Sequence, residues 1–461
     1  MKKNYLKCLL VFLFVFVPPA SFTALGQLPV NAAWKAGVAT VVITPDAPMW
    51  MAGYAARDHE SEGKLHDLWA KALALEDAQG NRAVLVTTDL LGFPKGISDR
   101  IRNRVEKKYD LTRAQILLNS SHTHSAPVLE DALTDIYPLD QRHKKQIQKY
   151  THELEDKIVA LVGRALQAMQ PAALFAQNGV TRFQVNRRNN PAATLTEATD
   201  LNGPNDHAVP VIKVSDPSGK LIAIAFGYAC HNTVLDGYTW SGDYAGFAQL
   251  EIEKMYPGVV ALFFQGAGAD QNPLPRRTVP LAQQYGRTLA AAVDRVLQEE
   301  MRALAPTLLT AYKEVELTLN SPPTREELAR QASETTGYHQ RWATRMIGNV
   351  EKGDKLRTTY PYPLQVWKLG DQSIFSLGGE LVIGYAIQLK RIFGQEIFVL
   401  GYSNDVMAYI PTTAILREGG YEGESSQIVY GLPNTWTSDI ETEIIYGMIS
   451  LAGQVGVLKA K

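Results

Sequence analysis

The stretch QILLNSSHTHSAP, residues 115–127, runs from an apolar segment directly into a polar segment that contains two histidines. Residues 115–119 form a short run that is mostly apolar, which predicts a buried strand. His122 and His124 follow with one residue between them, and side chains spaced this way in an extended chain point to the same side. The stretch therefore predicts a buried strand that ends at a pair of neighbouring imidazoles.

Strand-like apolar runs alternate with helical patterns along the rest of the chain. In residues 142–169, apolar side chains recur at helical spacing on one face, which predicts an amphipathic helix. Strands that alternate with helices are typical of α/β proteins, so we predict a mixed, largely parallel sheet flanked by helices. The predicted strands are 82–89, 115–119, 221–228, 259–265, 373–377 and 396–401, and the predicted helices are 97–109, 142–169 and 281–301.

Each predicted strand leads into a cluster of polar residues. Ligands of open α/β sheets bind beyond the carboxyl ends of the strands, so this repetition favours one convergent active site at the C-terminal strand ends. The clusters contain Asp89, His122, His231, Asp270, Glu380 and Asn404.

Two imidazoles and one carboxylate of these clusters form a familiar set of metal ligands. His122, His231 and Glu380 supply two nitrogens and one oxygen, and catalytic zinc is often held this way with one position open to water. Iron and manganese fit the same donor set. A single histidine at a strand end is more often a structural group, so spacing alone leaves both interpretations open. Asp243 and Asp270 are candidates to orient the ligating histidines, as carboxylates commonly do around zinc.

Several other functions lack support in the sequence. It contains no GxSxG elbow, no HExxH motif and no P-loop. The net charge of −1 and the lack of a dense basic block argue against a nucleic-acid partner. Cys230 precedes His231, and we interpret it as a small buried hydrophobic residue rather than a nucleophile.

The N-terminus has the three parts of a secretory signal. MKKNYLK is positively charged, CLLVFLFVFV is apolar but short for a membrane span, and PPASFTALG is rich in small residues. We therefore predict a signal peptide over residues 1–26, a secreted or periplasmic protein, and a single catalytic domain over residues 30–461. Loss of the signal removes Cys8 and leaves only Cys230, so no intrachain disulfide is expected.

Four motifs together resemble the neutral, non-lysosomal ceramidase family, in particular its N-terminal catalytic domain. They are AGVATVVITP at 36–45 with AGY at 52–54, NSSHTHSAP at 119–127, Tyr409, and YEGES at 421–425. The last two resemble the paired-tyrosine segment of that family. The resemblance spans nearly all of the chain that follows the predicted signal.

The resemblance implies a zinc-dependent hydrolase that cleaves the amide of ceramide or a similar N-acyl lipid, with transient contact to a membrane surface. The implied metal ligands are His122, His231, Glu380 and Tyr421, while His124 contacts the substrate and Tyr409 stabilises the oxyanion.

The resemblance also implies a substrate-binding arginine in the stretch that contains Arg187 and Arg188, and we favour Arg188. His124 is the expected proton donor to the leaving amine, since its ordinary pKa of about 6.5 suits that task.

The sequence departs from the family pattern at two points. The ceramidase Gly-Asp-Val-Ser-Pro segment contains a serine with an assigned nucleophilic role, but residues 269–273 here read ADQNP, with Asn272 at the serine position. Asparagine cannot form an acyl-enzyme, so either a metal-activated water attacks directly or the chemistry differs. In the first case Asn272 is a candidate donor to the oxyanion. The C-terminal immunoglobulin-like domain of full-length ceramidases is not expected in this chain.

Two other functions are compatible with these residues. One is a zinc-dependent esterase or amidase that acts on a carbohydrate or another small polar molecule. The other is a catalytically dead binding protein. Retention of His122, His124, His231, Glu380 and Tyr421 argues against the dead protein, because binding alone has no need of all five.

Overall fold

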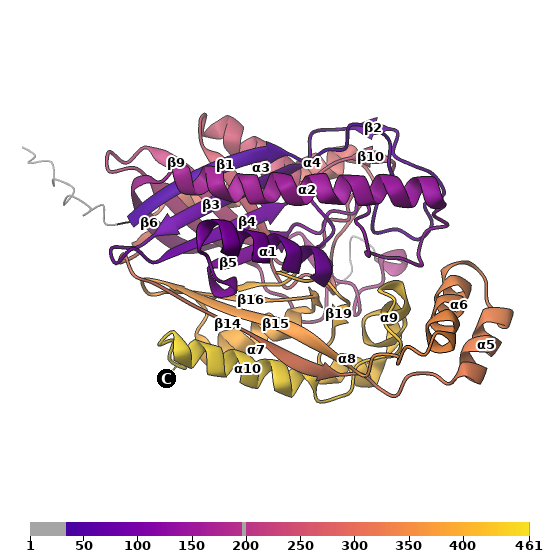
Figure 1. Cartoon of the computed structure of the whole chain (residues 1–461). Helices are drawn as coiled ribbons and strands as arrows, with labels where there is room; N and C mark the ends of the chain where they lie inside the picture. The colour runs from indigo at the N-terminus through magenta and orange to yellow at the C-terminus, as the bar shows by residue number, and fades with distance from the viewer. Residues whose placement is uncertain (1–33, 196–199, 461) are drawn as a thin grey trace, which may run out of the picture.

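The computed structural model describes residues 34–195 and 200–460, and the predicted signal peptide lies outside these ranges. Two β-sheets stack face to face, and helices cover the outer face of each sheet (Figure 1). This arrangement confirms the predicted mixed α/β class with flanking helices. Within the described ranges, no helix is long and apolar enough to cross a membrane.

The larger sheet has the strand order β11-β9-β8-β6-β1-β3-β4-β5, and the short β13 pairs with β6. Its strands are β1 (Trp34–Val42), β3 (Trp69–Glu76), β4 (Arg82–Thr88), β5 (Ile116–Ser120), β6 (Gln170–Val180), β8 (Ala208–Ser215), β9 (Leu221–Tyr228), β11 (Val260–Gln265) and β13 (Arg302–Ala303). The smaller sheet contains β14 (Leu308–Thr318), β15 (Thr359–Leu369), β16 (Gln372–Leu377) and β18 (Phe398–Leu400) in that order.

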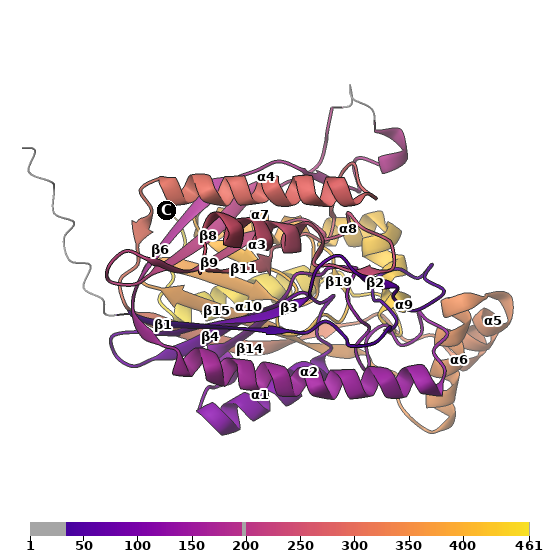
Figure 2. The ribbon, with the colours of Figure 1, turned by 90° about the horizontal axis from the view of Figure 1, so that it is seen from above.

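Helices cover the two halves of the larger sheet separately. One half packs against α1 (Lys95–Tyr109) and α2 (Gln141–Gln167), and the other half packs against α3 (Asp243–Met255) and α4 (Val279–Gln298). In Figure 2 the two helix pairs lie apart, each beside the strands of its own half of the sheet. The outer face of the smaller sheet packs against α7 (Ile383–Phe393) and α10 (Ile440–Gln454).

Alternation along the strands divides the apolar residues between these layers. In β4, Val84 and Val86 face α1 and α2, whereas Leu85 faces the smaller sheet, where it joins the same core as Trp367. Because successive side chains of a strand point to opposite faces, a strand that is covered on both sides must be apolar throughout. This explains why the buried strands read as continuous apolar runs.

The predicted strands and helices are all present, but the prediction of a largely parallel sheet is wrong. In the larger sheet only β4–β5 and β9–β11 are parallel, and the other pairs are antiparallel. Short turns join β3 to β4 and β8 to β9, which forces antiparallel pairing. Within these two sheets, the parallel pairs are those with a helical crossover: β4-α1-β5, β9-α3-β11 and, in the smaller sheet, β16-α7-β18.

The side chain of Asn119 joins the ends of three of these crossover strands. Its Oδ1 accepts the backbone N–H of Gln265 at 2.8 Å, and its Nδ2 donates to the carbonyl of Gly401 at 2.8 Å and to Ser403 Oγ at 3.1 Å. Asn119 is fully buried at the end of β5, whereas Gln265 ends β11 and Gly401 follows β18. One amide therefore holds both edges of the larger sheet against the smaller sheet.

The segment 321–354 forms a pair of helices. They are α5 (Arg325–Glu334) and α6 (Gly337–Glu351), which project from the sheets beside the short α9 (Ser426–Val429) in Figure 1. Arg345 of α6 forms a salt bridge with the buried Asp135 at 2.6 Å. The pair is thus attached to the loop that precedes α2.

Replacement of Asn119 by alanine is expected to destabilise the fold by about 1–3 kcal/mol, since it leaves the buried backbone N–H of Gln265 without its partner and removes one of the two donors to the carbonyl of Gly401. Urea unfolding followed by circular dichroism measures the effect. Asn103→Ala, on the exposed face of α1, is the control and should change stability by less than about 0.5 kcal/mol. Equal stability of the two variants would contradict the role given to Asn119.

Candidate metal centre

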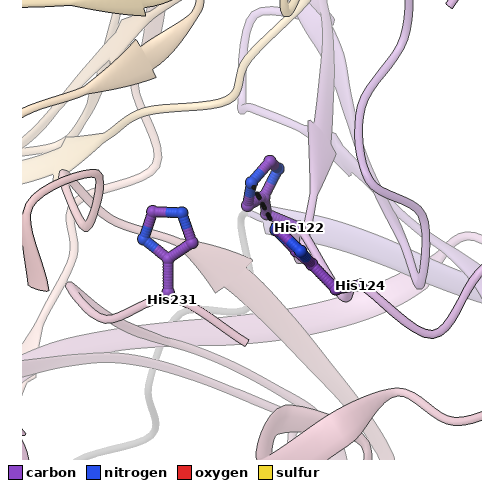
Figure 3. Close-up of side chains that lie close together, drawn as sticks. All are labelled: His122, His124 and His231. Atoms are coloured by element: carbon purple, nitrogen blue, oxygen red, sulfur yellow. Dashed lines mark hydrogen bonds between the residues drawn. The ribbon is translucent and has the colours of Figure 1, made fainter. Parts of the chain in front are cut away.

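Three loops that follow crossover strands bring His122, His231 and Glu380 together. Glu380 Oε2 lies 3.2 Å from His122 Nε2 and 3.0 Å from His231 Nε2, and all three side chains are buried. Figure 3 shows the imidazoles converging from two separate segments. The preceding Gly379 has φ of +67°, and a Cβ there would lie 2.5 Å from Ile410, so this sharp turn into Glu380 requires glycine.

Hydrogen bonds to the backbone define which nitrogen of each imidazole is free. His122 Nδ1 lies 2.6 Å from the carbonyl of Leu91, and His231 Nδ1 lies 2.7 Å from the carbonyl of Gly268. A carbonyl only accepts, so each Nδ1 carries the proton and each Nε2 has a free lone pair. The free lone pairs therefore face the Glu380 carboxylate.

The electrostatics of this arrangement call for a cation. Burial lowers the pKa of His231 to about 4, so this imidazole is neutral at pH 7. Burial alone would raise the pKa of Glu380, but His122 and His231 hold it well below its usual range. The neutral imidazole of His231 and the ionised Glu380 carboxylate then meet through acceptor atoms alone, which is unfavourable without a metal or a proton between them. The donor set fits zinc.

His124 lies beside this set. Its Nε2 is 3.2 Å from His122 Nε2, and ligand atoms of His122, His124 and His231 all lie within 4.8 Å of one another. Burial, followed by the two other histidines, lowers the pKa of His124 well below its ordinary value. The predicted proximity of His122 and His124 is confirmed. The reason given for it, the alternation of side chains along a strand, is wrong. β5 ends at Ser120, and His122 has a φ of +61°, which is not a strand conformation.

Tyr409, the predicted oxyanion donor, lies at the edge of the set. Its hydroxyl is 3.4 Å from His231 Nε2 and accepts a hydrogen bond from Arg187 Nη2 at 3.2 Å. Tyr421, the predicted fourth ligand, packs its ring 5.3 Å from that of Tyr409. Its side chain is 45% exposed, and no hydrogen bond of its hydroxyl to a described residue is formed.

Two other tyrosines contact the carboxylate, and the sequence interpretation had given them no role. Tyr430 donates to Glu380 Oε1 at 2.5 Å, and Tyr402 donates to Glu380 Oε2 at 3.5 Å. Tyr402 directly follows the predicted strand 396–401, and this position at a strand end is the sequence signal that points to the site. Tyr430 has no such signal, since it reaches the site from α9 and the turn after it.

The structure brings Arg187, rather than the favoured Arg188, to the site. Arg187 donates to Tyr409 and to Glu422 Oε1 at 2.7 Å. Arg188 instead bonds Glu418 and Glu422 Oε2, at 2.8 and 2.7 Å. Glu422 therefore binds both guanidinium groups and orders the segment next to Tyr421.

Asp243 and Asp270 do not orient the imidazoles directly, because backbone carbonyls already occupy both Nδ1 atoms. Asp243 accepts the N–H groups of Val234 and Leu235 and so shapes the loop after His231, and burial raises its pKa to about 6. Asp270 accepts the N–H of Ile383 at 2.9 Å, at the start of α7.

Asn272 and Cys230 flank the site. Asn272 is 4% exposed, and its Oδ1 has no hydrogen-bond partner among the described residues. Cys230 is fully buried, and burial raises the pKa of its thiol well above the ordinary value, which supports its interpretation as an inert hydrophobic residue.

Residues 34–274 match the family model described as neutral/alkaline non-lysosomal ceramidase, N-terminal. The chain belongs to this family. Neutral ceramidase A of Dictyostelium discoideum is 28% identical over 273 residues, covering 54% of this chain and 37% of that protein. Neutral ceramidase of Pseudomonas aeruginosa is 26% identical over 254 residues, covering 52% and 37%. The chain thus spans little more than a third of the length of these curated relatives.

The fold matches that of a solved ceramidase. The crystal structure of neutral ceramidase from Pseudomonas aeruginosa superposes with a TM-score of 0.72 at 19% identity, covering 93% of this chain and 75% of the other. The resemblance drawn from the sequence motifs is therefore confirmed at the level of family and fold.

The wild-type protein is expected to bind close to one zinc ion per chain, and His122→Ala is expected to lose it, because the remaining donors no longer enclose the ion. Elemental analysis of purified, folded protein measures the content. His59→Ala, at a solvent-exposed histidine, is the matched control and should retain zinc. Zinc retained by both variants would exclude His122 as a ligand.

Asp405 lies behind the metal centre and is almost fully buried. Its backbone carbonyl accepts the N–H of Gly379 at 2.7 Å, and its Oδ2 accepts the hydroxyl of Tyr360 at 2.8 Å. Its Oδ1 has no partner among the described residues, and burial raises its pKa to about 7. The carboxyl is therefore protonated in the folded protein under mildly acidic conditions in which the unfolded chain is ionised.

This shift predicts a pH-dependent stability. Between the unfolded pKa of about 4 and the folded pKa of about 7, the wild type loses stability as pH rises. Asp405→Asn removes this loss. From pH 5 to pH 8, the free energy of unfolding of the variant should therefore rise by on the order of 2 kcal/mol relative to that of the wild type. Urea unfolding of metal-free protein at both values measures the difference. A pH-independent difference would contradict the raised pKa.

Proposed function

We propose that the protein hydrolyses the amide bond of ceramide or a similar N-acyl lipid, with zinc as its metal and water as the nucleophile. The observation that carries the proposal is the Glu380 carboxylate held between the free Nε2 atoms of His122 and His231. Membership of the ceramidase family supports the amide substrate. Zinc bound there lowers the pKa of a water towards about 7 and polarises the scissile carbonyl.

Tyr409 and Arg187 stabilise the oxyanion that forms when the amide carbonyl is attacked. Burial raises the pKa of Tyr409 well above its ordinary value, so the phenol keeps its proton and acts as a donor. The hydrogen bond from Arg187 orients this hydroxyl and strengthens it as a donor. Donors fixed before the reaction act where charge develops and need no reorganisation.

His124 moves the proton. The lowered pKa leaves the imidazole neutral, so it is able to accept a proton from the attacking water and deliver it to the departing nitrogen. The absence of a side chain at Gly53 gives His124 its space, since a Cβ there would lie 2.4 Å from Nδ1. The ring of Tyr54 packs 4.7 Å from that of His124 and limits its movement.

Asn272 occupies the position of the family serine, so the proposed reaction proceeds without an acyl-enzyme. The unpartnered Oδ1 of Asn272 is a free acceptor for the attacking water. Its Nδ2 is the proposed donor to the oxyanion. Secretion through the signal over residues 1–26, and contact with a membrane surface to reach the lipid, are part of the same proposal.

The test is fatty-acid release from ceramide by purified protein with measured zinc content. Tyr409→Phe is expected to lower kcat about 100-fold while zinc binding persists, because one oxyanion donor is lost. Tyr446→Phe is the control at a 68% exposed position and should keep wild-type activity. If the purified protein contains zinc but does not cleave ceramide, ceramide is rejected as the substrate and a small polar ester or amide is favoured. Turnover unaffected in Tyr409→Phe would reject the role of Tyr409.

A further inference from the structure

Three arginines gather around Tyr54, next to the candidate metal centre. We call Arg57, Arg276 and Arg277 the arginine cluster. The guanidinium groups of Arg57 and Arg277 lie 5.0 and 5.1 Å from the centre of the Tyr54 ring. Arg277 Nη1 also donates to the Tyr54 hydroxyl at 3.0 Å. Arg276 is half-buried and donates to Thr233 Oγ1 at 3.4 Å.

The charges of this cluster are not balanced by the protein. Arg277 pairs with Asp236 at 3.3 Å, but neither Arg57 nor Arg276 has a carboxylate within salt-bridge distance among the described residues. Arg57 is only 4% exposed, donates to two backbone carbonyls and has an unpartnered Nε.

A buried guanidinium without a counter-charge is unfavourable, and burial accordingly lowers the pKa of both Arg57 and Arg276. Among the described residues, Asp236 is the one carboxylate that forms a salt bridge with the cluster, and its partner is Arg277. The arginine cluster therefore presents uncompensated positive charge.

The cluster borders the His124 side of the metal centre. Tyr54, which the arginines surround, packs against His124, and Thr233, which Arg276 contacts, follows His231 by two residues. Arg187 differs from the cluster, since Glu422 neutralises it and Tyr409 occupies one of its donors. Of Arg187 and the cluster, Arg57 and Arg276 are therefore the arginines without a carboxylate partner among the described residues.

We propose that the arginine cluster binds an anionic group on the substrate, and that this group belongs to the amine half of the scissile amide. The first part rests on the unpaired charges. The second part rests on the proposed function, in which His124 protonates the leaving nitrogen on this side. The preferred substrates are then acyl amides whose amine half carries a carboxylate, phosphate or sulfate. Guanidinium groups recognise the paired oxygens of such anions through parallel hydrogen bonds.

The test compares two amides that share an acyl chain and differ in charge. N-dodecanoylglycine is anionic, its N-methylamide is neutral, and release of dodecanoate measures cleavage of both. Wild type should prefer the anionic amide, and Arg276→Gln should lower the ratio of the two kcat/KM values about tenfold, since a charge-assisted contact is lost. Arg295→Gln, at an 82% exposed side chain of α4, should keep the wild-type ratio. An unchanged ratio in Arg276→Gln, or a wild-type preference for the neutral amide, would overturn the proposal.

A binding measurement separates this proposal from the proposed function. Inorganic phosphate, titrated at constant ionic strength, should raise the melting temperature of wild type and of Arg295→Gln, but raise that of Arg276→Gln much less. If phosphate stabilises wild type more than Arg276→Gln but neither amide is cleaved, the proposed amide hydrolysis is rejected and the proposed anion site is supported. Equal phosphate stabilisation of all three proteins would reject the anion site, whatever the activity.

Discussion

The buried amide of Asn119 is the contact on which the position of the candidate metal centre depends. It bonds the backbone of β11 and of the residues after β18, so the ends of β5, β11 and β18 are fixed at one point. Gln265, which Asn119 holds, donates in turn to the carbonyl of Cys230 at 2.7 Å. Asn232 donates to the carbonyl of Ser121 at 2.6 Å. The residues next to His122 and those on either side of His231 thus belong to one satisfied polar network.

The strands that could be predicted from the sequence are the crossover strands. The predicted runs correspond to β4, β5, β9, β11, β16 and β18, which form the parallel pairs of the larger and the smaller sheet. Such strands are covered on both faces and therefore read as continuous apolar runs. β14 and β6 were missed because one face of each is partly exposed, which breaks the run. The mistaken expectation of a largely parallel sheet follows directly, since only parallel strands had been detected.

The same reasoning explains which site residues the sequence revealed. His122, His231 and Glu380 follow crossover strands, so position along the chain was enough to predict that they lie close together. Tyr430 is delivered by a segment with no strand before it, and only tertiary packing brings it to Glu380. The choice between Arg187 and its neighbour depended on where β7 (Gln184–Asn186) ends, a detail that apolar patterns do not resolve.

Charge around the centre divides into a balanced side and an unbalanced side, and this division orients the proposed substrate. On the balanced side, Glu422 neutralises Arg187, which leaves Tyr409 as a neutral donor suited to a carbonyl oxygen. On the other side, Arg57 and Arg276 keep positive charge beside His124. A scissile amide with its oxygen towards Tyr409 therefore turns its nitrogen, and whatever that nitrogen carries, towards cations. An uncharged amine half would leave those cations in place without a partner, whereas an anion would satisfy them.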